Sequence, residues 1–210
     1  KTEKMSLFKV LLFLSLTSAK AASPPPFADK YGTARWLTHI LDWATLSTIS
    51  SRTAIAGIPF GNPTSFSDGP VDDSSGIPYF YTSDLDASMQ DVFVAGNNMV
   101  SLSLSENAVD GGVDSCVISS GGDPESPVCA RLVLSGQYVN VSGTSEESFA
   151  QSALMTRHPQ MDTWPVDHSW FYAKLVITDI WLIDIYGGAS ILDVDQYYAV
   201  NMTDISLKKN

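Results

Sequence analysis

A β-prone run of 16 residues, 171–186, constrains the fold more than any other feature of this sequence. Aromatic and β-branched residues dominate the run, and such residues favour extended structure. The run is too long for one typical strand. We therefore expect a bend near Thr178 and Asp179 to divide it into two strands, and the glycines at 187–188 to end the second.

The rest of the 210-residue chain alternates between shorter β-rich runs and three helical segments. The runs lie at residues 45–50, 58–67, 78–81, 99–105 and 130–141. The helices begin near residues 32–33, at Ser83 and at a capping-box pattern over residues 144–147, and Pro159 ends the third. This order predicts one α+β domain over residues 31–205, in which mostly antiparallel strands with short flanking helices close into a β-barrel.

The first two helices each have a face that the sequence predicts. The first carries a polar face, on which we expect His39 to be solvated or locally hydrogen-bonded. That face consists of Arg35, Thr38, His39 and Asp42. The second is expected to bury one apolar face, which consists of Leu85, Met89, Val92 and Phe93.

The first 21 residues have the pattern of a secretory signal peptide. A positive segment that ends at Lys9 precedes an apolar run over residues 10–16, and Ala19-Lys20-Ala21 provides the small-x-small pattern that signal peptidase accepts. Met5 is the expected initiator, which makes residues 1–4 upstream translated sequence. The alternative is a buried N-terminal strand or helix. Since a membrane span takes about 20 apolar residues, we expect no membrane span but a soluble, secreted or lumenal protein, with residues 22–30 as a proline-rich extended lead-in.

The chain is acidic, and its basic residues are unevenly distributed. It carries 12 Lys and Arg against 23 Asp and Glu, and removal of the signal peptide, with four lysines and one glutamate, changes the net charge from −11 to −14. Nucleic-acid binding requires a basic surface, so direct contact with DNA or RNA is not expected. Between Arg52 and Arg131 lie 78 residues without Lys or Arg but with 11 Asp or Glu. A phosphate group in this span would have to be held by backbone N–H groups and hydroxyls.

Two cysteines and two glycosylation triplets agree with the secretory route. In an oxidising compartment Cys116 and Cys129 are expected to form one disulfide, which would stabilise the fold by roughly 3 kcal/mol. Two free buried thiols are the alternative. The triplets that begin at Asn140 and Asn201 are N-glycosylation acceptors, and we expect at least one of them to be used.

Catalytic and metal-binding motifs are absent from the sequence. It has no Gly-x-Ser-x-Gly elbow, no phosphate-binding P-loop and no His-Glu-x-x-His. The spacing of His39, His158 and His168 matches no standard zinc motif. We therefore predict no catalytic residue and no metal ligand. A Ser/His/Asp hydrolase could be assembled in the aromatic-rich segment 157–172, but a packed aromatic corner over the barrel explains the same residues.

Several motifs taken together resemble one protein family. The run 45–50 followed by residues 57–60 is similar to the opening hairpin of the FMN-binding split-barrel superfamily, which includes pyridoxamine-phosphate oxidases. Further motifs are similar to those of the CREG family of secreted, glycosylated split-barrel proteins, and the resemblance runs from about Ala34 to Asn201. These motifs are Ser67-Asp68-Gly69-Pro70, residues 76–81, 123–129, 134–136 and 157–161, Trp164-Pro165, Trp170-Phe171 and residues 180–188.

The resemblance implies a homodimeric split barrel that follows the secretory and endolysosomal route and restrains growth or promotes differentiation. It also implies a flavin scaffold that has lost FMN, with a loop that fills the former pocket at the dimer interface. By position, this pocket-filling loop consists of Asp123, Pro124, Glu125, Ser126, Pro127 and Val128. The cysteines and the Asn201 triplet also match the family. Val176 stands where relatives can carry a further glycosylated asparagine, so glycans for a mannose-phosphate receptor would be fewer here.

These expectations favour a non-enzymatic glycoprotein without a cofactor, sorted through its glycans or bound by a cell-surface receptor. The alternative is an FMN-dependent oxidoreductase on the same fold, and a lysosomal hydrolase is a third reading. FMN carries a doubly charged phosphate, which split-barrel oxidases hold with Arg or Lys. The middle strands of this chain lie largely in the span that has neither. Any effect on transcription, which the family name suggests, is expected to be indirect.

Overall fold

The computed structural model describes residues 24–110 and 112–204. The predicted signal peptide, the first two residues of the predicted lead-in and residue 205 lie outside the described residues. Within the described ranges, no helix is both long enough and apolar enough to cross a membrane.

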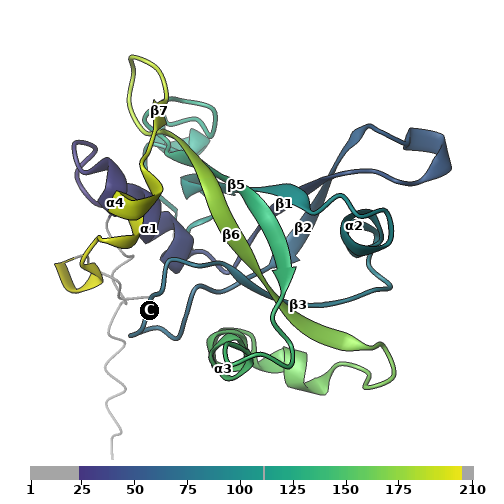
Figure 1. Cartoon of the computed structure of the whole chain (residues 1–210). Coiled ribbons are helices and arrows are strands. Elements are labelled where there is room, and N and C mark those ends of the chain that lie inside the picture. Colours follow the sequence, from purple (N-terminus) through teal and green to yellow (C-terminus); the bar gives the residue numbers. More distant parts are fainter. Residues whose placement is uncertain (1–23, 111, 205–210) are drawn as a thin grey trace, which may run out of the picture.

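The described strands are all antiparallel and form one sheet that curls into a split β-barrel (Figure 1). They are β1 (Trp43–Ile49), β2 (Pro59–Ser65), β3 (Tyr79–Ser83), β4 (Met99–Ser105), β5 (Arg131–Asn140), β6 (Trp170–Ile183) and β7 (Ser190–Ile191). Their order is β2-β1-β4-β5-β6-β3, with β7 beside β6. The two ends of the sheet are therefore β2 and β3, and one bridge between Ser67 and Tyr79 joins the chain after β2 to β3. The barrel closes at this bridge and leaves a seam beyond it.

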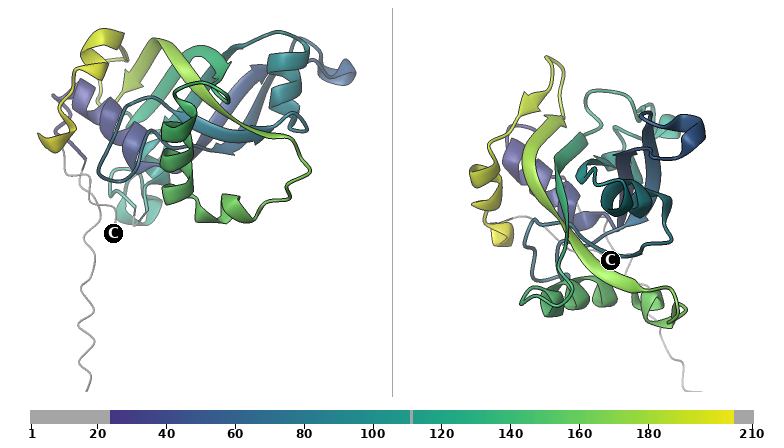
Figure 2. Two further views of the ribbon diagram at one scale, coloured as in Figure 1. Left: turned by 60° about the horizontal axis from the view of Figure 1, so that its bottom comes forward. Right: turned by 45° about the vertical axis from the view of Figure 1, so that its right-hand side comes forward.

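Short α-helices flank this sheet, as the sequence predicts. They are α1 (Lys30–Ile40), α2 (Ala87–Met89), α3 (Glu147–Arg157) and α4 (Val194–Tyr198). Figures 1 and 2 show α1 beside α4 at one end of the barrel and α3 near β3 at the other. The first helix starts earlier than expected because Asp29 caps it: Asp29 Oδ1 accepts a hydrogen bond of 2.9 Å from the Gly32 N–H.

The long β-prone run is one strand rather than two, contrary to the expectation. The register of β6 against β5 shifts at Ser135 and Gly136, opposite Thr178, so that Thr178 is the extra residue of a β-bulge. A bulge bends a strand and increases its twist without ending it. Gly136 is required at this point because a Cβ on it would lie 2.0 Å from the carbonyl oxygen of Val176.

The core is formed by alternate side chains of the strands together with the apolar stripe of α1. Leu46, Leu102 and Leu134 point inward from β1, β4 and β5 and pack with Trp36 and Leu37 of α1 in one cluster of buried side chains. Each such side chain contributes about 1.5–3 kcal/mol when it is fully buried. A smaller cluster lies under α3 and contains Tyr79, Val141, Ala150, Leu154, Met161 and Tyr172.

The polar face of α1 is buried rather than solvated, so the expectation for His39 was wrong in that respect. His39 is 2% exposed, and its Nδ1 lies 2.6 Å from Asp68 Oδ1. Its Nε2 lies 2.9 Å from the carbonyl oxygen of Val71. Asp68 also accepts hydrogen bonds from Ser74 Oγ and the Gly76 N–H at 2.5 and 3.1 Å. The loop between β2 and β3 folds back on α1 and supplies acceptors to both ring nitrogens, which spacing along the helix alone does not reveal.

Arg35 joins the same loop to the last helix. Its guanidinium donates to the carbonyl oxygens of Ser74 and Tyr197 at 3.0 and 3.3 Å. It also lies 5.3 Å from the centre of the Tyr197 ring. The Tyr197 hydroxyl donates to the carbonyl oxygen of Gly76 at 2.8 Å. One buried polar network therefore connects α1, the loop after β2 and α4.

The second helix does not present the expected apolar face. After α2 the chain continues as a π-helical turn, Gln90–Val94. Because this turn is wider than an α-helical turn, side chains at α-helical spacing no longer share one face. Met89 and Val92 are buried as predicted, whereas Phe93 is 41% exposed. Leu85, 69% exposed, precedes the helix, which is capped by Asp86 rather than by the expected Ser83.

Replacement of Asp68 by asparagine is expected to lower the free energy of unfolding by about 3 kcal/mol, because the amide cannot accept all the buried hydrogen bonds that the carboxylate accepts from Ser74 Oγ and the Gly76 N–H while it also faces His39 Nδ1. Urea titrations of Asp68→Asn and the parent protein measure the difference. Asp72 lies exposed in the same loop, so Asp72→Asn should change stability by less than about 0.5 kcal/mol. Equal stability of all three proteins would mean that the sheet alone holds the loop.

Candidate functional site

A cavity of about 430 Å³ lies at the seam between β2 and β3. We call it the seam cavity. Its lining consists of residues 63–65 of β2, residues 81–83 of β3, Leu85, Asp86, Trp164, His168 and Trp170. Cavities of this size accommodate small molecules or cofactors, so the seam cavity is a candidate binding site.

The electrostatics of the seam cavity do not favour an anion. Its lining contains no Lys or Arg, and its one carboxylate is Asp86. Asp86 is fixed by hydrogen bonds from Asn62 Nδ2 at 3.0 Å and from the Ser88 N–H at 2.8 Å. A fixed carboxylate in a partly desolvated cavity repels a second negative charge.

Aromatic rings form one wall of the seam cavity. Tyr81 stacks on Trp170 and Trp164, with ring centres 5.1 and 5.9 Å apart and ring planes inclined by 23° and 21°. Tyr172 lies 4.9 Å from Tyr81. Trp170 Nε1 donates to the carbonyl oxygen of Pro165 at 2.7 Å. The segment 157–172 thus contributes the packed aromatic corner that the sequence favours.

His158 and His168 are not arranged with a serine as in a Ser/His/Asp hydrolase. His158 Nε2 lies 3.0 Å from the carbonyl oxygen of Phe66. His168 Nε2 lies 3.7 Å from the exposed carboxylate of Asp167. Among the described residues, no serine hydroxyl is hydrogen-bonded to a histidine ring, which a Ser–His nucleophile requires.

The outward side of β1, β4 and β5 carries many small side chains, and we call it the outer sheet face. It consists of Trp43, Thr45, Ser47, Ile49, Met99, Ser101, Ser103, Ser105, Arg131, Val133 and Ser135, with Asp179 and Trp181 from β6. Two cavities of about 370 and 290 Å³ lie on it. Trp43, Ile49 and Met99 are 50%, 39% and 48% exposed. Its charged residues are Arg131 and, opposite Ser135 on β6, the exposed Asp179. The Arg131 guanidinium donates to the carbonyl oxygen of Glu125 at 3.0 Å.

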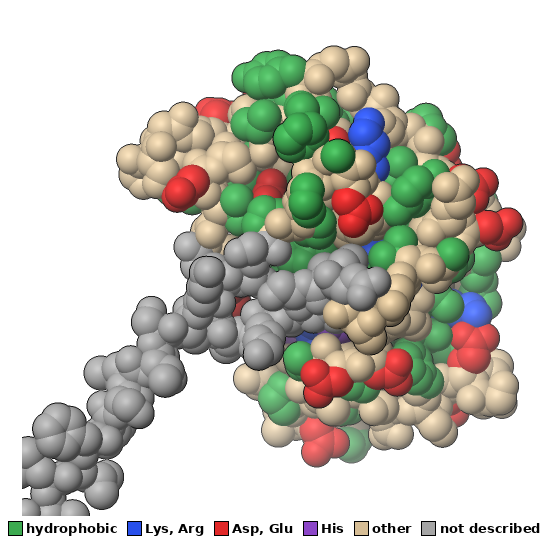
Figure 3. Space-filling model, turned by 90° about the vertical axis from the view of Figure 1, so that its left-hand side faces the viewer, with side chains coloured by type: hydrophobic (Ala, Val, Ile, Leu, Met, Phe, Trp, Pro, Cys, Tyr) green, Lys and Arg blue, Asp and Glu red, His purple; other side chains and the backbone are tan. Residues whose placement is uncertain are grey.

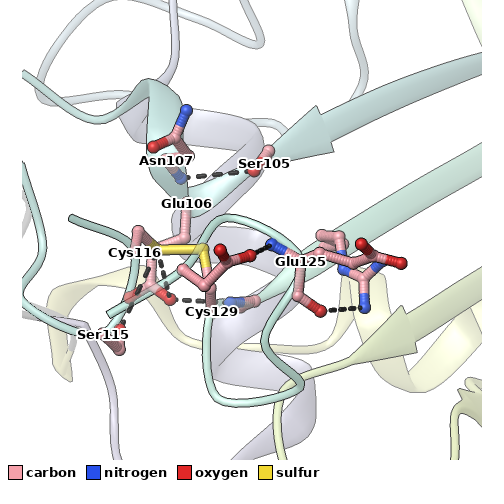
Figure 4. Close-up of a disulfide and its surroundings, with 10 residues drawn as sticks. Ser105, Glu106, Asn107, Ser115, Cys116, Glu125 and Cys129 are labelled. Carbon is pink, nitrogen blue, oxygen red and sulfur yellow. Dashed lines mark hydrogen bonds between the residues drawn. A yellow bond between two sulfur atoms is a disulfide. The ribbon is translucent and has the colours of Figure 1, made fainter. Parts of the chain in front are cut away.

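Cys116 and Cys129 are joined in a disulfide, as the sequence predicts (Figure 4). Glu106 lies against this bond, with Oε2 3.8 Å from Cys116 Sγ. The same oxygen accepts a hydrogen bond of 2.7 Å from the Ala130 N–H. Glu106 and the two sulfurs lie close enough to share a metal ion. Because the sulfurs are bonded to each other, they are not available as thiolate ligands.

The predicted pocket-filling loop lies within the segment that the disulfide closes. Its residues are exposed or half-buried. None of them lines the seam cavity of its own chain. The bond from Arg131 to Glu125 places the loop beside the outer sheet face, while Val128 lines a different cavity. The filling of a pocket by this loop in a dimer stays a prediction.

A fourth cavity, of about 370 Å³, lies between the first described residues and the disulfide. We call it the acidic cavity. Its lining consists of residues 24–27, Thr33, Glu106, Ser115, Val128, Ala130, Asp184 and Ile185. Burial raises the pKa of both carboxyl groups; the Ala130 N–H opposes the rise for Glu106, and the charge of Lys30 opposes it for Asp184.

Both glycosylation triplets begin with an exposed asparagine. Asn140 Oδ1 accepts from the Ser142 N–H at 2.8 Å. Asn201 Oδ1 accepts from Thr203 Oγ1 at 2.8 Å. Both side chains are therefore accessible to a glycosyltransferase, and their modification stays a prediction.

The surface at the α1 and α4 end carries scattered acidic side chains and few basic ones (Figure 3). The part of this face that is drawn in colour shows no basic patch of the kind that nucleic acid requires.

Sequence reasoning did not single out Glu106 or Asp184. Glu106 directly follows β4, and Asp184 directly follows β6. Each is the first acidic residue after a buried strand, a position that usually turns toward solvent. Their proximity depends on the pairing of β4, β5 and β6, which no local sequence signal reports.

The comparisons with known protein sequences all point to one family. The model of the family described as "CREG, beta-barrel" matches residues 25–199. Protein CREG1 of Gallus gallus is 37% identical over 198 residues, which cover 93% of this chain and 99% of that protein. Protein CREG1 of Homo sapiens is 40% identical over 178 residues, which cover 85% of this chain and 77% of that protein.

Solved structures with a similar fold are more distant in sequence. The heme binding protein from Mycobacterium smegmatis has a TM-score of 0.62 at 16% identity, over 84% of this chain and 62% of that one. Campylobacter jejuni ChuZ has a TM-score of 0.53 at 12% identity, over 74% and 55%. These likenesses show the fold alone. Since the family model spans nearly the whole described barrel and the relatives above cover most of the chain, this protein belongs to the CREG family.

Proposed function

We propose that the protein is a secreted or endolysosomal glycoprotein that controls growth or differentiation by binding a receptor or partner, without catalysing a reaction. In this proposal its split barrel has lost FMN binding. The observation that carries the proposal is the lining of the seam cavity, which has no Lys or Arg and includes the carboxylate of Asp86.

The phosphate of FMN needs charge-assisted hydrogen bonds from Arg or Lys. Of the four described cavities, only the larger one on the outer sheet face includes a cation, Arg131. That guanidinium already donates to Glu125. Arg52, at the other end of the basic-free span, lies 4.6 Å from the centre of the Phe60 ring and lines none of these cavities. Neither arginine lines the seam cavity, so neither supplies a cation for a phosphate there.

The secreted protein, purified from a eukaryotic host, is expected to show no visible flavin absorbance and no rise in Tm on addition of FMN. A flavin oxidoreductase of the same fold, run in parallel, serves as the positive control. Yellow protein with a flavin spectrum, or a saturable FMN-dependent rise in Tm, would contradict the proposal.

The alternative function, an FMN-dependent oxidoreductase, rests on Arg131. If FMN does bind, this is the cation in the described cavities that could hold its phosphate. Arg131→Ala would then abolish the FMN-dependent rise in Tm, and Arg52→Ala would leave it unchanged. Absence of the rise in the parent protein removes the alternative.

The proposal includes a homodimer formed through the outer sheet face. Two copies of the chain without the signal peptide, each with net charge −14, repel each other, but this face carries few charged residues, so contact through it avoids most of the repulsion. A twofold axis through the face would bring the exposed Trp43, Ile49 and Met99 of one copy onto the small serine and threonine side chains of the other. The same arrangement would bring the pocket-filling loop, which borders the face at Arg131, close to the second copy.

Introduction of a charge on this face should separate the copies. Ser103→Glu is expected to convert a dimer into a monomer, because two like charges would be buried close to the twofold axis. Size-exclusion chromatography with light scattering gives the mass in solution. Ser152→Glu, on the exposed side of α3, should remain dimeric. A dimeric Ser103→Glu variant would place the interface elsewhere, and a monomeric parent protein would remove the dimer.

Recognition by a receptor is proposed to depend on glycans at the exposed asparagines. The acidic surface argues against direct DNA contact, so any transcriptional effect would follow from signalling at the cell surface or in the lysosome. Asn201→Gln is expected to lose the mass of one glycan and to enter cells more slowly, with the remaining uptake still competed by mannose 6-phosphate. Intact-mass spectrometry and an uptake assay measure the two effects. Asn98→Gln, an exposed asparagine outside any triplet, is the control, and equal uptake of both variants would exclude a role for this glycan.

A further inference from the structure

We propose that the acidic cavity binds a small organic ammonium ion of the alkylamine class. The charged end would lie against Glu106 and Asp184, and the hydrocarbon end would lie against the apolar walls. The cavity is separate from the seam cavity and shares no residue with it. The inference is therefore independent of the question of FMN.

Unpartnered polar atoms point to a missing hydrogen-bond donor. Asp184 Oδ2 and Thr33 Oγ1 are buried and have no hydrogen-bond partner among the described residues. Asp184 is 8% exposed and Thr33 is 3% exposed, and both line the cavity. Buried polar atoms without a partner are rare, and each costs about 1–3 kcal/mol. A primary ammonium group has three donors and no acceptor, so it could satisfy both atoms.

The charge of the cavity points to a cation. Two carboxyl groups line it, and none of its lining residues is Lys, Arg or His. Lys30 is the cation whose charge reaches Asp184, but its ammonium group donates to Ser190 Oγ. No ion pair joins Lys30 to Asp184 in the described part of the chain. The raised pKa of both carboxyls reflects the cost of holding their charge in the cavity, and a bound cation would offset that cost.

The residues that line the acidic cavity suit an organic cation better than a metal ion. Calcium binds about six to eight oxygen ligands, whereas the carboxyls and hydroxyls of this lining are few. Most of the remaining lining is hydrocarbon, from residues 24–27, Val128 and Ile185. A hydrocarbon chain attached to an ammonium group would bury its carbon atoms there. A volume of about 370 Å³ is sufficient for a small amine, and the wall at Phe27 is open to solvent, since that ring is 59% exposed.

Ligand-observed NMR with n-butylammonium tests the proposal on the full glycosylated protein. The expected result is saturable binding at least about tenfold tighter than that of 1-butanol, which has similar size but no charge. Asp184→Asn is expected to weaken n-butylammonium binding by about tenfold, because it removes the charge and keeps the shape. Asp179→Asn, an exposed acidic residue of the neighbouring strand, should leave the affinity unchanged.

Any of the following three outcomes would overturn the proposal. Equal affinity for 1-butanol and n-butylammonium would mean that only the apolar walls bind, and this comparison needs no variant. Displacement of n-butylammonium by millimolar calcium, together with a calcium-dependent rise in Tm that Asp184→Asn removes, would assign the cavity to a metal. Full binding by a folded Asp184→Asn variant would place the ligand elsewhere. If that variant fails to fold, Glu106→Gln provides the same charge test at the other carboxyl group.

Discussion

The buried carboxylate of Asp68 connects parts of the chain that the sheet alone leaves separate. It accepts hydrogen bonds from its own loop and faces the imidazole of His39 on α1. Through Ser74 and Arg35 the same network reaches α4 near the end of the described chain. Because the loop after β2 is held in this way, β3 returns to the far edge of the sheet. The hydrogen bonds of one buried carboxylate therefore hold the loop that connects the two edges of the seam against α1.

The acidity of the chain has different consequences in different places. On the exposed surface it argues against binding to nucleic acid. In the seam cavity the decisive fact is that the lining has no Lys or Arg for a phosphate. In the acidic cavity two carboxyls are buried together without a bound counter-charge among the described residues. The outer sheet face is the part that carries almost no charge, and it is the surface best suited to contact a second copy.

Much of the fold could be predicted because it is encoded locally. Strand β4 alternates serines with apolar residues, and Pro159 ends the third helix as short-range rules describe. The errors arose where distant segments meet. His39 was expected to be solvated or hydrogen-bonded locally, because the loop that buries it lies about 30 residues further along the chain. The bulge at Thr178 depends on Gly136 in the neighbouring strand. The residues that line the acidic cavity come from segments that are far apart in the sequence, so no sequence motif indicates the cavity.

The stretch without Lys or Arg also determines how proteases can attack the molecule. An enzyme that cleaves after basic residues can reach Arg52, which is exposed on the hairpin between β1 and β2. It finds no further site for 78 residues, until the half-buried Arg131. The fragment in between contains β2, β3 and β4, and each of them is paired with a strand outside the fragment. After a single cut at the hairpin, each strand of this fragment would still be paired with a strand outside it.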